Sequence, residues 1–322
     1  MASVLRIGFL STLYHTSHLL RSGGKIEKEL GLTCRWDLFG TGPEMIQAFG
    51  RNEIDLGYIG LPPALIGISS GIPIVCVAGG HVEGTVMVGP ARCRDLEACS
   101  GFEDFLHQFH RSRIGIPARG SVHDVIFRDL LMRHPGPEIE IVNFRWADLI
   151  PHGLRRGEID CAVGTPPLAV LCQRELGTRI LVPPGKFWPF SPSCGIVVRR
   201  EFLTGTEDVL LEGVLRLHEE ACNLIRRCPE EAARSVVLAL PGVDEALVQE
   251  VYRISPHYCA SLPDPYIQSG LDFIPVLTRL GYLKKPVRPE EAFDTRTIQR
   301  AHPAPHHYMD PGRLGVCPQP GD

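Results

Sequence analysis

Several features that mark membrane and nucleic-acid-binding proteins are missing from this sequence. Its most apolar region, residues 54–68, is interrupted by Asp55 and by the pair Pro62-Pro63, and no run reaches the about 18 to 20 apolar residues that a membrane span needs. The formal net charge is −4, so the chain has no basic excess for nucleic acid or for a lipid surface. We therefore expect neither a nucleic-acid partner nor membrane insertion.

The motifs of common catalytic and metal sites are also missing. The eleven cysteines form no CxxC pair, and there is no HExxH motif, no phosphate-binding P-loop and no recognisable Ser-His-Asp arrangement. A pyridoxal phosphate enzyme needs a lysine for its Schiff base, and only Lys186 of the five lysines lies near a predicted cleft. These absences predict no metal and no cofactor, and they count against an enzyme.

The cysteines and the beginning of the chain bear on localisation. An odd number of scattered cysteines, in a chain of 322 residues that can bury large cores, predicts reduced and buried thiols. A first strand is expected almost at Met1, with no signal-peptide pattern before it. We therefore favour the cytoplasm, and a periplasmic or other extracytoplasmic location is the alternative if an export segment has been removed.

What the sequence does contain is a repeat with a period of about 105 residues. Two short motifs occur twice in the same order: Arg-Ile-Gly at residues 6–8 and 113–115, and Glu-Ile-Asp at residues 53–55 and 158–160. Each Glu-Ile-Asp leads to a Gly-x-Pro-Pro, at residues 60–63 and 164–167. Two copies with so long a period indicate two similar lobes rather than a solenoid, and two lobes enclose a cleft.

Each copy alternates short β-branched runs with longer helical patterns, which predicts βαβ units. In the first copy we expect strands at residues 4–10, 33–39, 55–59 and 74–78, and helices at 14–30, 43–51 and 62–70. In the second we expect strands at residues 113–116, 139–143, 160–164 and 179–182, and helices at 121–133, 146–155 and 166–176. The predicted fold is α/β, with a mainly parallel sheet flanked by helices in each lobe.

Two β-rich runs, residues 85–88 and 194–198, are predicted to carry the chain between the lobes as a two-crossing hinge. Lobe I should then comprise residues 1–86 and 195–284, lobe II residues 87–194, and residues 285–322 an extended C-terminal tail. Helical segments at residues 208–227, 230–240, 245–253 and 266–280 are expected to pack on lobe I. The tail, rich in Pro, Arg and His, is expected to be partly disordered or to lie over the surface.

Loops at the carboxyl ends of parallel strands line the ligand crevice, and this rule gives the candidate ligand contacts. Proline suits the first turn of a helix, so each Gly-x-Pro-Pro should start a helix at the cleft, although it could be ordinary strand-to-helix punctuation. Trp188 is the best candidate for an aromatic wall, ahead of Trp146 and Phe190. The predicted contacts are Ser11, Thr12, Tyr14, His15, Gly40, Thr41, Gly60, Leu61, Pro62, His81 and Glu83 from lobe I, and Arg119, Ser121, Gly164, Thr165 and Trp188 from lobe II.

Residues 118–121 lead into a helix whose unpaired N–H groups and dipole favour an anion. Arg119 could add a charge-assisted contact to an acidic ligand. Two alternatives stay open: Arg119 could be a solvated loop arginine, and Ser121 could simply cap its helix.

Three stretches carry a resemblance to a known family: residues 6–11 (Arg-Ile-Gly-Phe-Leu-Ser), 50–63 and 71–75. They resemble the type II periplasmic-binding-protein fold, and within it the nitrate, sulfonate and taurine binders together with the thiamine-pyrimidine-synthase relatives. The similarity covers roughly residues 4 to 280, and it implies two lobes that close over a small molecule as the binding component of an ABC transporter. Together with the helix start after residues 118–121, it predicts a small, anionic organic solute. A permease is then a possible partner, and we expect a monomer or a weak dimer. A cytosolic enzyme on the same fold, similar to the pyrimidine-precursor synthases, or a ligand sensor is the alternative.

Overall fold

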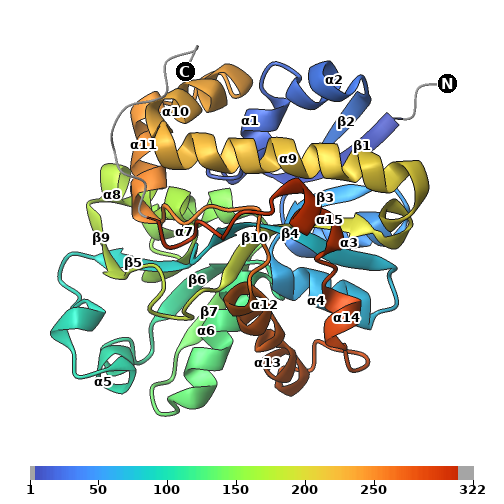
Figure 1. Ribbon diagram of the computed structural model, residues 1–322. Coiled ribbons are helices and arrows are strands. Elements are labelled where there is room, and N and C mark those ends of the chain that lie inside the picture. The colour runs from blue at the N-terminus through green and yellow to red at the C-terminus, as the bar shows by residue number, and fades with distance from the viewer. Residues whose placement is uncertain (1–3, 311–322) are drawn as a thin grey trace.

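Two five-stranded sheets form the centre of the structure, a computed structural model that describes residues 4–310 (Figure 1). In spatial order, the first sheet contains β2 (Thr33–Phe39), β1 (Val4–Leu10), β3 (Leu56–Ile59), β10 (Pro192–Arg199) and β4 (Ile74–Val82). The second contains β7 (Glu140–Phe144), β6 (Arg113–Pro117), β8 (Cys161–Gly164), β5 (Val86–Pro90) and β9 (Thr178–Val182).

The two sheets share one topology, which is the structural form of the sequence repeat. Strands β1, β2 and β3 pair in parallel, as do β6, β7 and β8. In each sheet the fourth strand is antiparallel to its neighbours and is a strand that has just crossed from the other lobe, β10 in the first sheet and β5 in the second. The predicted crossing segments are thus integral strands of the sheets, and each sheet is mainly parallel as expected.

The repeated motifs make the same contacts in both lobes. Asp55 accepts a hydrogen bond from the backbone N–H of Arg6 at 2.9 Å and returns one to its carbonyl at 2.8 Å. Asp160 does the same with Arg113, at 2.8 Å in both directions. These paired bonds attach the start of the third strand of each lobe to the first strand.

The glycine of each Arg-Ile-Gly motif is needed for close packing. A Cβ on Gly8 would lie 2.9 Å from Cδ1 of Ile54, and a Cβ on Gly115 would lie 2.2 Å from Cδ1 of Ile159. Both isoleucines are buried, so the side chain before each aspartate packs directly on the backbone of the first strand.

Helices flank the sheets of each lobe, and the helices predicted at residues 14–30 and 266–280 are each divided in two. The helices and 3-10 turns up to β10 are α1 (Ser17–Arg21), α2 (Lys25–Leu30), α3 (Gly42–Gly50), α4 (Leu61–Ser69), η1 (Leu96–Ala98), α5 (Phe102–His107), α6 (Val122–Arg133), η2 (Ala147–Leu149), α7 (Ile150–Arg155) and α8 (Pro166–Leu176). The single helix expected at residues 14–30 is wrong, because Gly23 and Gly24 adopt positive φ angles of 71° and 64° and divide it into α1 and α2.

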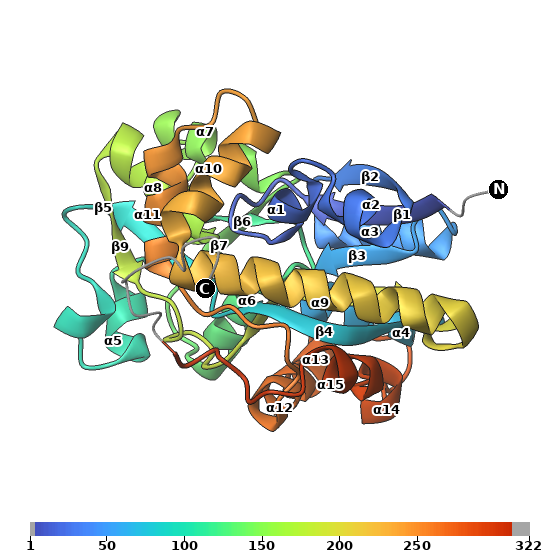
Figure 2. The ribbon, with the colours of Figure 1, turned by 45° about the horizontal axis from the view of Figure 1, so that its top comes forward.

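The chain after β10 continues through η3 (Arg200–Leu203), α9 (Gly205–Arg227), α10 (Pro229–Ala239), α11 (Glu245–Ile254), α12 (Asp264–Leu271), α13 (Phe273–Arg279), α14 (Pro289–Ala292) and α15 (Arg296–Ala301). The long helix α9 runs across the molecule and contacts α1, α2 and β4 of lobe I (Figures 1 and 2). The expectation that every helix in this region packs on lobe I is wrong for α11, which contacts α8. Arg174 of α8 there forms ion pairs with Asp244 and Glu250.

The segment expected to be an extended tail is folded as far as the structure describes it. It contains α14 and α15, and Tyr308 is fully buried. Its residues cover the outer edge of β4: Phe293 bridges Cys76, and the Tyr308 hydroxyl accepts from the N–H of Gly80. Residues 311–322 of the predicted tail lie outside the described part of the chain.

The cysteines are mostly free thiols, as the sequence predicts. Those found free are Cys34, Cys76, Cys93, Cys99, Cys161, Cys172, Cys194, Cys222 and Cys259, and six of these nine are buried. The prediction is wrong for Cys228, which is disulfide-bonded. Among residues 4–310, none of the helices has the length and apolar character needed to cross a membrane.

The glycine contact in lobe II gives a test of this packing. Gly115→Ala should lower the free energy of unfolding by about 1 to 3 kcal/mol, because its Cβ overlaps Cδ1 of Ile159. Ile159→Val removes that carbon and alone should cost about 0.5 to 1.5 kcal/mol. In urea unfolding, the double variant should lose less stability than the sum of the single variants. Strictly additive losses would show that the two residues are not in the contact described.

Candidate functional site

A cavity of about 360 Å³ lies between the two lobes, at the carboxyl ends of their parallel strands. Its walls come from the segments that follow β1, β2 and β3 in lobe I and those that follow β6, β7 and β8 in lobe II, together with Ser193 at the start of β10 and Leu240 after α10. This volume is within the range of small-molecule sites. The repeated topology therefore aims corresponding loops of both lobes at one space.

Nine of the sixteen residues expected to contact a ligand line this cavity. They are Ser11, Thr12, Tyr14, His15, Gly40, Thr41, Gly60, Ser121 and Thr165. All follow the ends of β1, β2, β3, β6 or β8, so the strand-end rule brings them together. Their role in ligand binding stays a prediction.

The other seven lie outside the cavity lining. Two of them, His81 and Glu83, do so because β4 is longer than predicted. This strand extends to Val82 because it pairs with β10, whereas the sequence predicted its end near residue 78. His81 is consequently a buried strand residue whose Nε2 is 2.9 Å from the carbonyl of Ser255. Glu83 accepts a hydrogen bond from the N–H of Phe190.

The remaining residues outside the lining are used for packing. Leu61 and Pro62 are buried in the first turn of α4, and Gly164 pairs with β5 inside the sheet. Trp188 stacks on Phe273 with ring centroids 4.2 Å apart and donates to Ser269, so it belongs to a different face of the molecule.

Arg119 is exposed and its guanidinium lies over the ring of Tyr282, 5.5 Å from the centroid. Its Nε donates to the hydroxyl of Tyr282 at 3.2 Å. It is therefore a surface loop residue in this arrangement, which corresponds to the alternative left open from the sequence.

Four helices begin at the cavity, at Thr41, Gly60, Ser121 and Thr165, but they differ in the N–H groups they offer. The prolines that start α8 have no N–H, and the side chain of Thr41 accepts from the N–H of Glu44 in α3. In α6 the side chain of Ser121 caps the N–H of Asp124. Helix α6 still presents the N–H groups of its first two residues, Val122 and His123, toward the end that faces the cavity.

Arg21, the last residue of α1, brings a positive charge to the cavity. One nitrogen donates to the carbonyl of Ala239 at 3.0 Å, and the guanidinium lies over the Phe9 ring at 4.9 Å. Its Nε is buried and has no hydrogen-bond partner within residues 4–310, and no ion pair holds it there. A buried charge-bearing donor without a partner favours an anion as its neighbour.

Three histidines also line the cavity, and burial keeps them neutral. Burial lowers the pKa of His18 and that of His123 to about 4, and it lowers the pKa of His15 well below the ordinary value, with His18 adding to the shift of His15. His123 is fixed by the hydroxyl of Thr85 at 3.0 Å. Near neutral pH these rings therefore act as uncharged hydrogen-bonding groups.

The lobes touch each other around the cavity. The hydroxyl of Ser11 donates to Asp148 of lobe II at 2.7 Å. A Cβ on Gly40 would lie 2.5 Å from the indole of Trp146, and one on Gly60 would lie 2.3 Å from Val122. Gly60, a predicted ligand contact, is also approached closely by a side chain of the opposite lobe. The two lobes are thus in direct contact around the cavity.

Comparison with known proteins shows the family. Residues 2–240 match the NMT1-like family. The chain belongs to the NMT1-like family. No curated protein matches this NMT1-like chain.

Solved structures share its fold. The alkanesulfonate-binding protein SsuA from Xanthomonas axonopodis pv. citri, bound to MOPS, has a TM-score of 0.76 at 16% identity, over 91% of this chain and 98% of that one. The zinc-bound ligand-binding component of an ABC-type import system from Staphylococcus aureus has a TM-score of 0.77 at 15% identity, over 94% and 100%. The periplasmic nitrate-binding protein NrtA from Synechocystis PCC 6803 has a TM-score of 0.72 at 12% identity, over 97% and 91%. The predicted type II periplasmic-binding-protein fold and its family are confirmed.

The sequence missed several cavity residues of this NMT1-like protein. His18 and Arg21 lie within the predicted first helix, where the strand-end rule does not look, and the only signal was the Gly23-Gly24 pair that ends α1 early. His123 is the second residue of α6. Asp148 lies in η2 after β7, a segment from which the sequence offered only Trp146, as part of an aromatic wall.

The neutral histidines predict a pH dependence of stability. Between pH 6.5 and 4 the unfolded chain binds protons at the ordinary histidine pKa, whereas His18 and His123 bind them only near pH 4. The free energy of unfolding should therefore fall as the pH is lowered through this window, by up to about 1.4 kcal/mol per pH unit for each histidine. His123→Asn should flatten the slope in urea unfolding, and the exposed control His152→Asn should leave it unchanged. Equal slopes for His123→Asn and the unmodified chain would refute the assignment.

Proposed function

We propose that this protein binds a small organic anion between its lobes as the solute-recognition component of an ABC-type import system. The observation that carries the proposal is Arg21, a cation without an acidic partner among the described residues, in a cavity enclosed by both lobes. The N-terminus of α6 enters the same cavity and favours negative charge. The structurally similar proteins that bind MOPS or nitrate, or that serve an ABC-type import system, support the same function.

The lining of the cavity limits the kinds of solute that can bind there. The walls of the cavity that holds Arg21 are largely apolar, with contributions from Phe9, Leu10, Leu13, Leu38, Val122, Leu171 and Leu240. Asp148, the acid in this lining, is engaged by Ser11 at 2.7 Å. A charged head group such as a carboxylate or sulfonate, attached to a short apolar body, satisfies both the cation and the apolar walls.

The enzyme alternative gains no support from the described cavity. No lysine is among its lining residues, and Lys186 is exposed outside it. The histidines there are neutral and buried, and they serve a binding site as hydrogen-bonding groups. The similar alkanesulfonate-binding, nitrate-binding and import-system proteins are ligand-binding proteins. The nitrate-binding protein is periplasmic, which supports the extracytoplasmic alternative for this chain.

Native mass spectrometry of the purified protein tests the function directly. We expect a co-purified organic anion that is released on denaturation, and isothermal titration should then show saturable binding of that anion or of MOPS and short carboxylates. No saturable binding of any organic anion, after complete removal of co-purified material, would contradict the proposal.

Arg21→Gln tests which arginine holds the anion. Loss of a hydrogen bond to a charged group costs about 1.5 to 3 kcal/mol, so the Kd measured by calorimetry should rise by about 10- to 150-fold. Arg119→Gln is the matched control, because Arg119 lies over Tyr282 outside the cavity, and its Kd should be unchanged. The opposite pattern would move the anion site to the loop before α6.

Ligand binding should also compact the molecule. The contacts of Ser11 with Asp148 and of Gly60 with Val122 exist only when the lobes meet, and a ligand that touches both lobes shifts the population toward this arrangement. Small-angle scattering should show a smaller radius of gyration with saturating ligand. An identical radius in both states would remove closure from the proposed function.

A further inference from the structure

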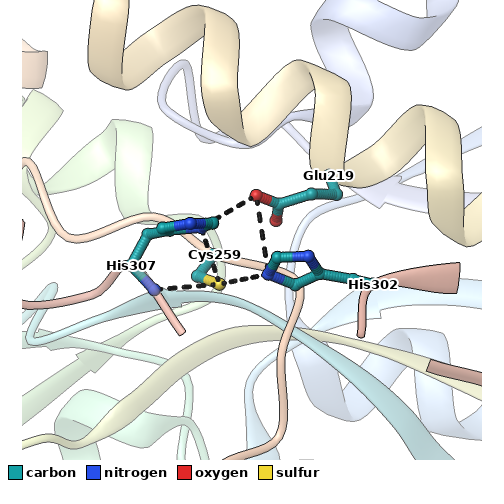
Figure 3. Close-up of side chains that lie close together, drawn as sticks. All are labelled: Glu219, Cys259, His302 and His307. Atoms are coloured by element: carbon teal, nitrogen blue, oxygen red, sulfur yellow. Dashed lines mark hydrogen bonds and ion pairs between the residues drawn. The ribbon is translucent and has the colours of Figure 1, made fainter. Parts of the chain in front are cut away.

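Four side chains that can bind a metal converge beneath helix α9 (Figure 3). Glu219 comes from α9, Cys259 from the segment after α11, and His302 and His307 from the segment after α15. The side chains of Glu219 and His302 are 8% and 7% exposed, Cys259 is fully buried, and His307 is 24% exposed. They are separated by up to 88 residues in the chain, which is why no spacing motif reveals them.

Four of the six distances between their donor atoms are close to the edges of a coordination tetrahedron. Metal bonds of about 2.3 Å to sulfur and about 2.0 to 2.1 Å to nitrogen and oxygen give tetrahedron edges of about 3.6 Å and about 3.3 Å. Sγ of Cys259 lies 3.5 Å from Nε2 of His302 and 3.8 Å from Nδ1 of His307. Oε1 of Glu219 lies 3.3 Å from that Nδ1 and 3.9 Å from that Nε2. All four donor atoms lie within 4.8 Å of one another.

The surroundings hold the sulfur and the carboxylate in place. The backbone N–H groups of Ser261 and His307 both donate to Sγ of Cys259 at 3.4 Å and fix the position of the sulfur. Oε2 of Glu219 accepts from the N–H of Ala260 at 2.7 Å, and Arg226 donates to Oε1 at 3.3 Å. Outer partners of this kind orient the ligands of metal sites.

We propose that Glu219, Cys259, His302 and His307 form a closed, four-ligand site for a zinc-class divalent metal ion. One sulfur, two imidazole nitrogens and one carboxylate oxygen form a donor set that suits Zn²⁺, and a thiolate with a carboxylate offsets its two charges. Four protein ligands leave no open position, so the site is structural rather than catalytic. A surface hollow beside His302 and a partly exposed His307 give the ion a way in.

The role of the ion follows from the elements it joins. It ties the segment that carries His302 and His307 to the middle of α9, beside the point where Tyr308 and Cys259 bond to Gly80 of β4. Metal binding should therefore hold the C-terminal segment on the edge of the first sheet. Because only the folded chain brings the four ligands together, the ion should raise the stability of the fold.

Cobalt and zinc binding to the untagged full-length protein, stripped with a chelator, tests the site. We expect one equivalent of Co²⁺ to give a thiolate-to-cobalt charge-transfer band with tetrahedral d–d bands, Zn²⁺ to displace it, and either ion to raise the thermal unfolding midpoint. Zinc-edge X-ray absorption of the unmodified protein should show one sulfur neighbour at about 2.3 Å. Absence of the charge-transfer band, or of that sulfur, would overturn the proposal without any variant.

Variants locate the ion. Cys259→Ser should abolish the charge-transfer band, and both Cys259→Ser and His307→Ala should weaken Zn²⁺ binding by more than the about 10- to 100-fold that loss of an outer hydrogen bond causes. The controls Cys99→Ser and His152→Ala, which remove the same residue types far from the cluster, should bind Zn²⁺ unchanged. A folded Cys259→Ser protein that keeps the band would place the ion elsewhere and refute the assignment.

Discussion

In both lobes, the packing of a buried isoleucine against a glycine of the first strand sets the position of the third strand. Ile54 packs on Gly8, and Ile159 packs on Gly115, closely enough that a methyl group on either glycine would overlap. The aspartate after each isoleucine then bonds in both directions to the backbone of the arginine two residues before the glycine. Together these contacts fix the start of β3 against β1, and of β8 against β6.

The cavity follows from this alignment of β3 with β1 and of β8 with β6. Once the starts of the strands are fixed, their carboxyl ends deliver the helix starts at Gly60 and Thr165 to opposite sides of one space. Gly40 and Gly60 leave room for Trp146 and Val122 of the other lobe. Glycine therefore permits close packing both inside each lobe and between the lobes. The charge of Arg21 faces the enclosed space.

The sequence predicted what is encoded locally and missed what depends on distant pairing. The repeat predicted both sheets, and the strand-end rule brought residues such as Ser11 and Thr165 to the cavity. It misplaced His81 because β4 is lengthened by its pairing with β10, a contact across more than a hundred residues. It treated His302 and His307 as tail residues because their partners, Glu219 and Cys259, adjoin them only after α9 and β4 are assembled.

The edge of the first sheet adds a constraint on how the chain is made. Strand β4 is the last strand of its sheet, and its outer N–H and carbonyl groups are paired by Tyr258, Ala260, Asp294 and Tyr308. An uncovered edge strand is a template for pairing with another chain. Because its cover is synthesised more than 170 residues after Val82, every nascent chain carries an unprotected strand edge for most of its time on the ribosome. The edge of β4 is thus protected only after the far end of the same polypeptide has been made and has folded onto it.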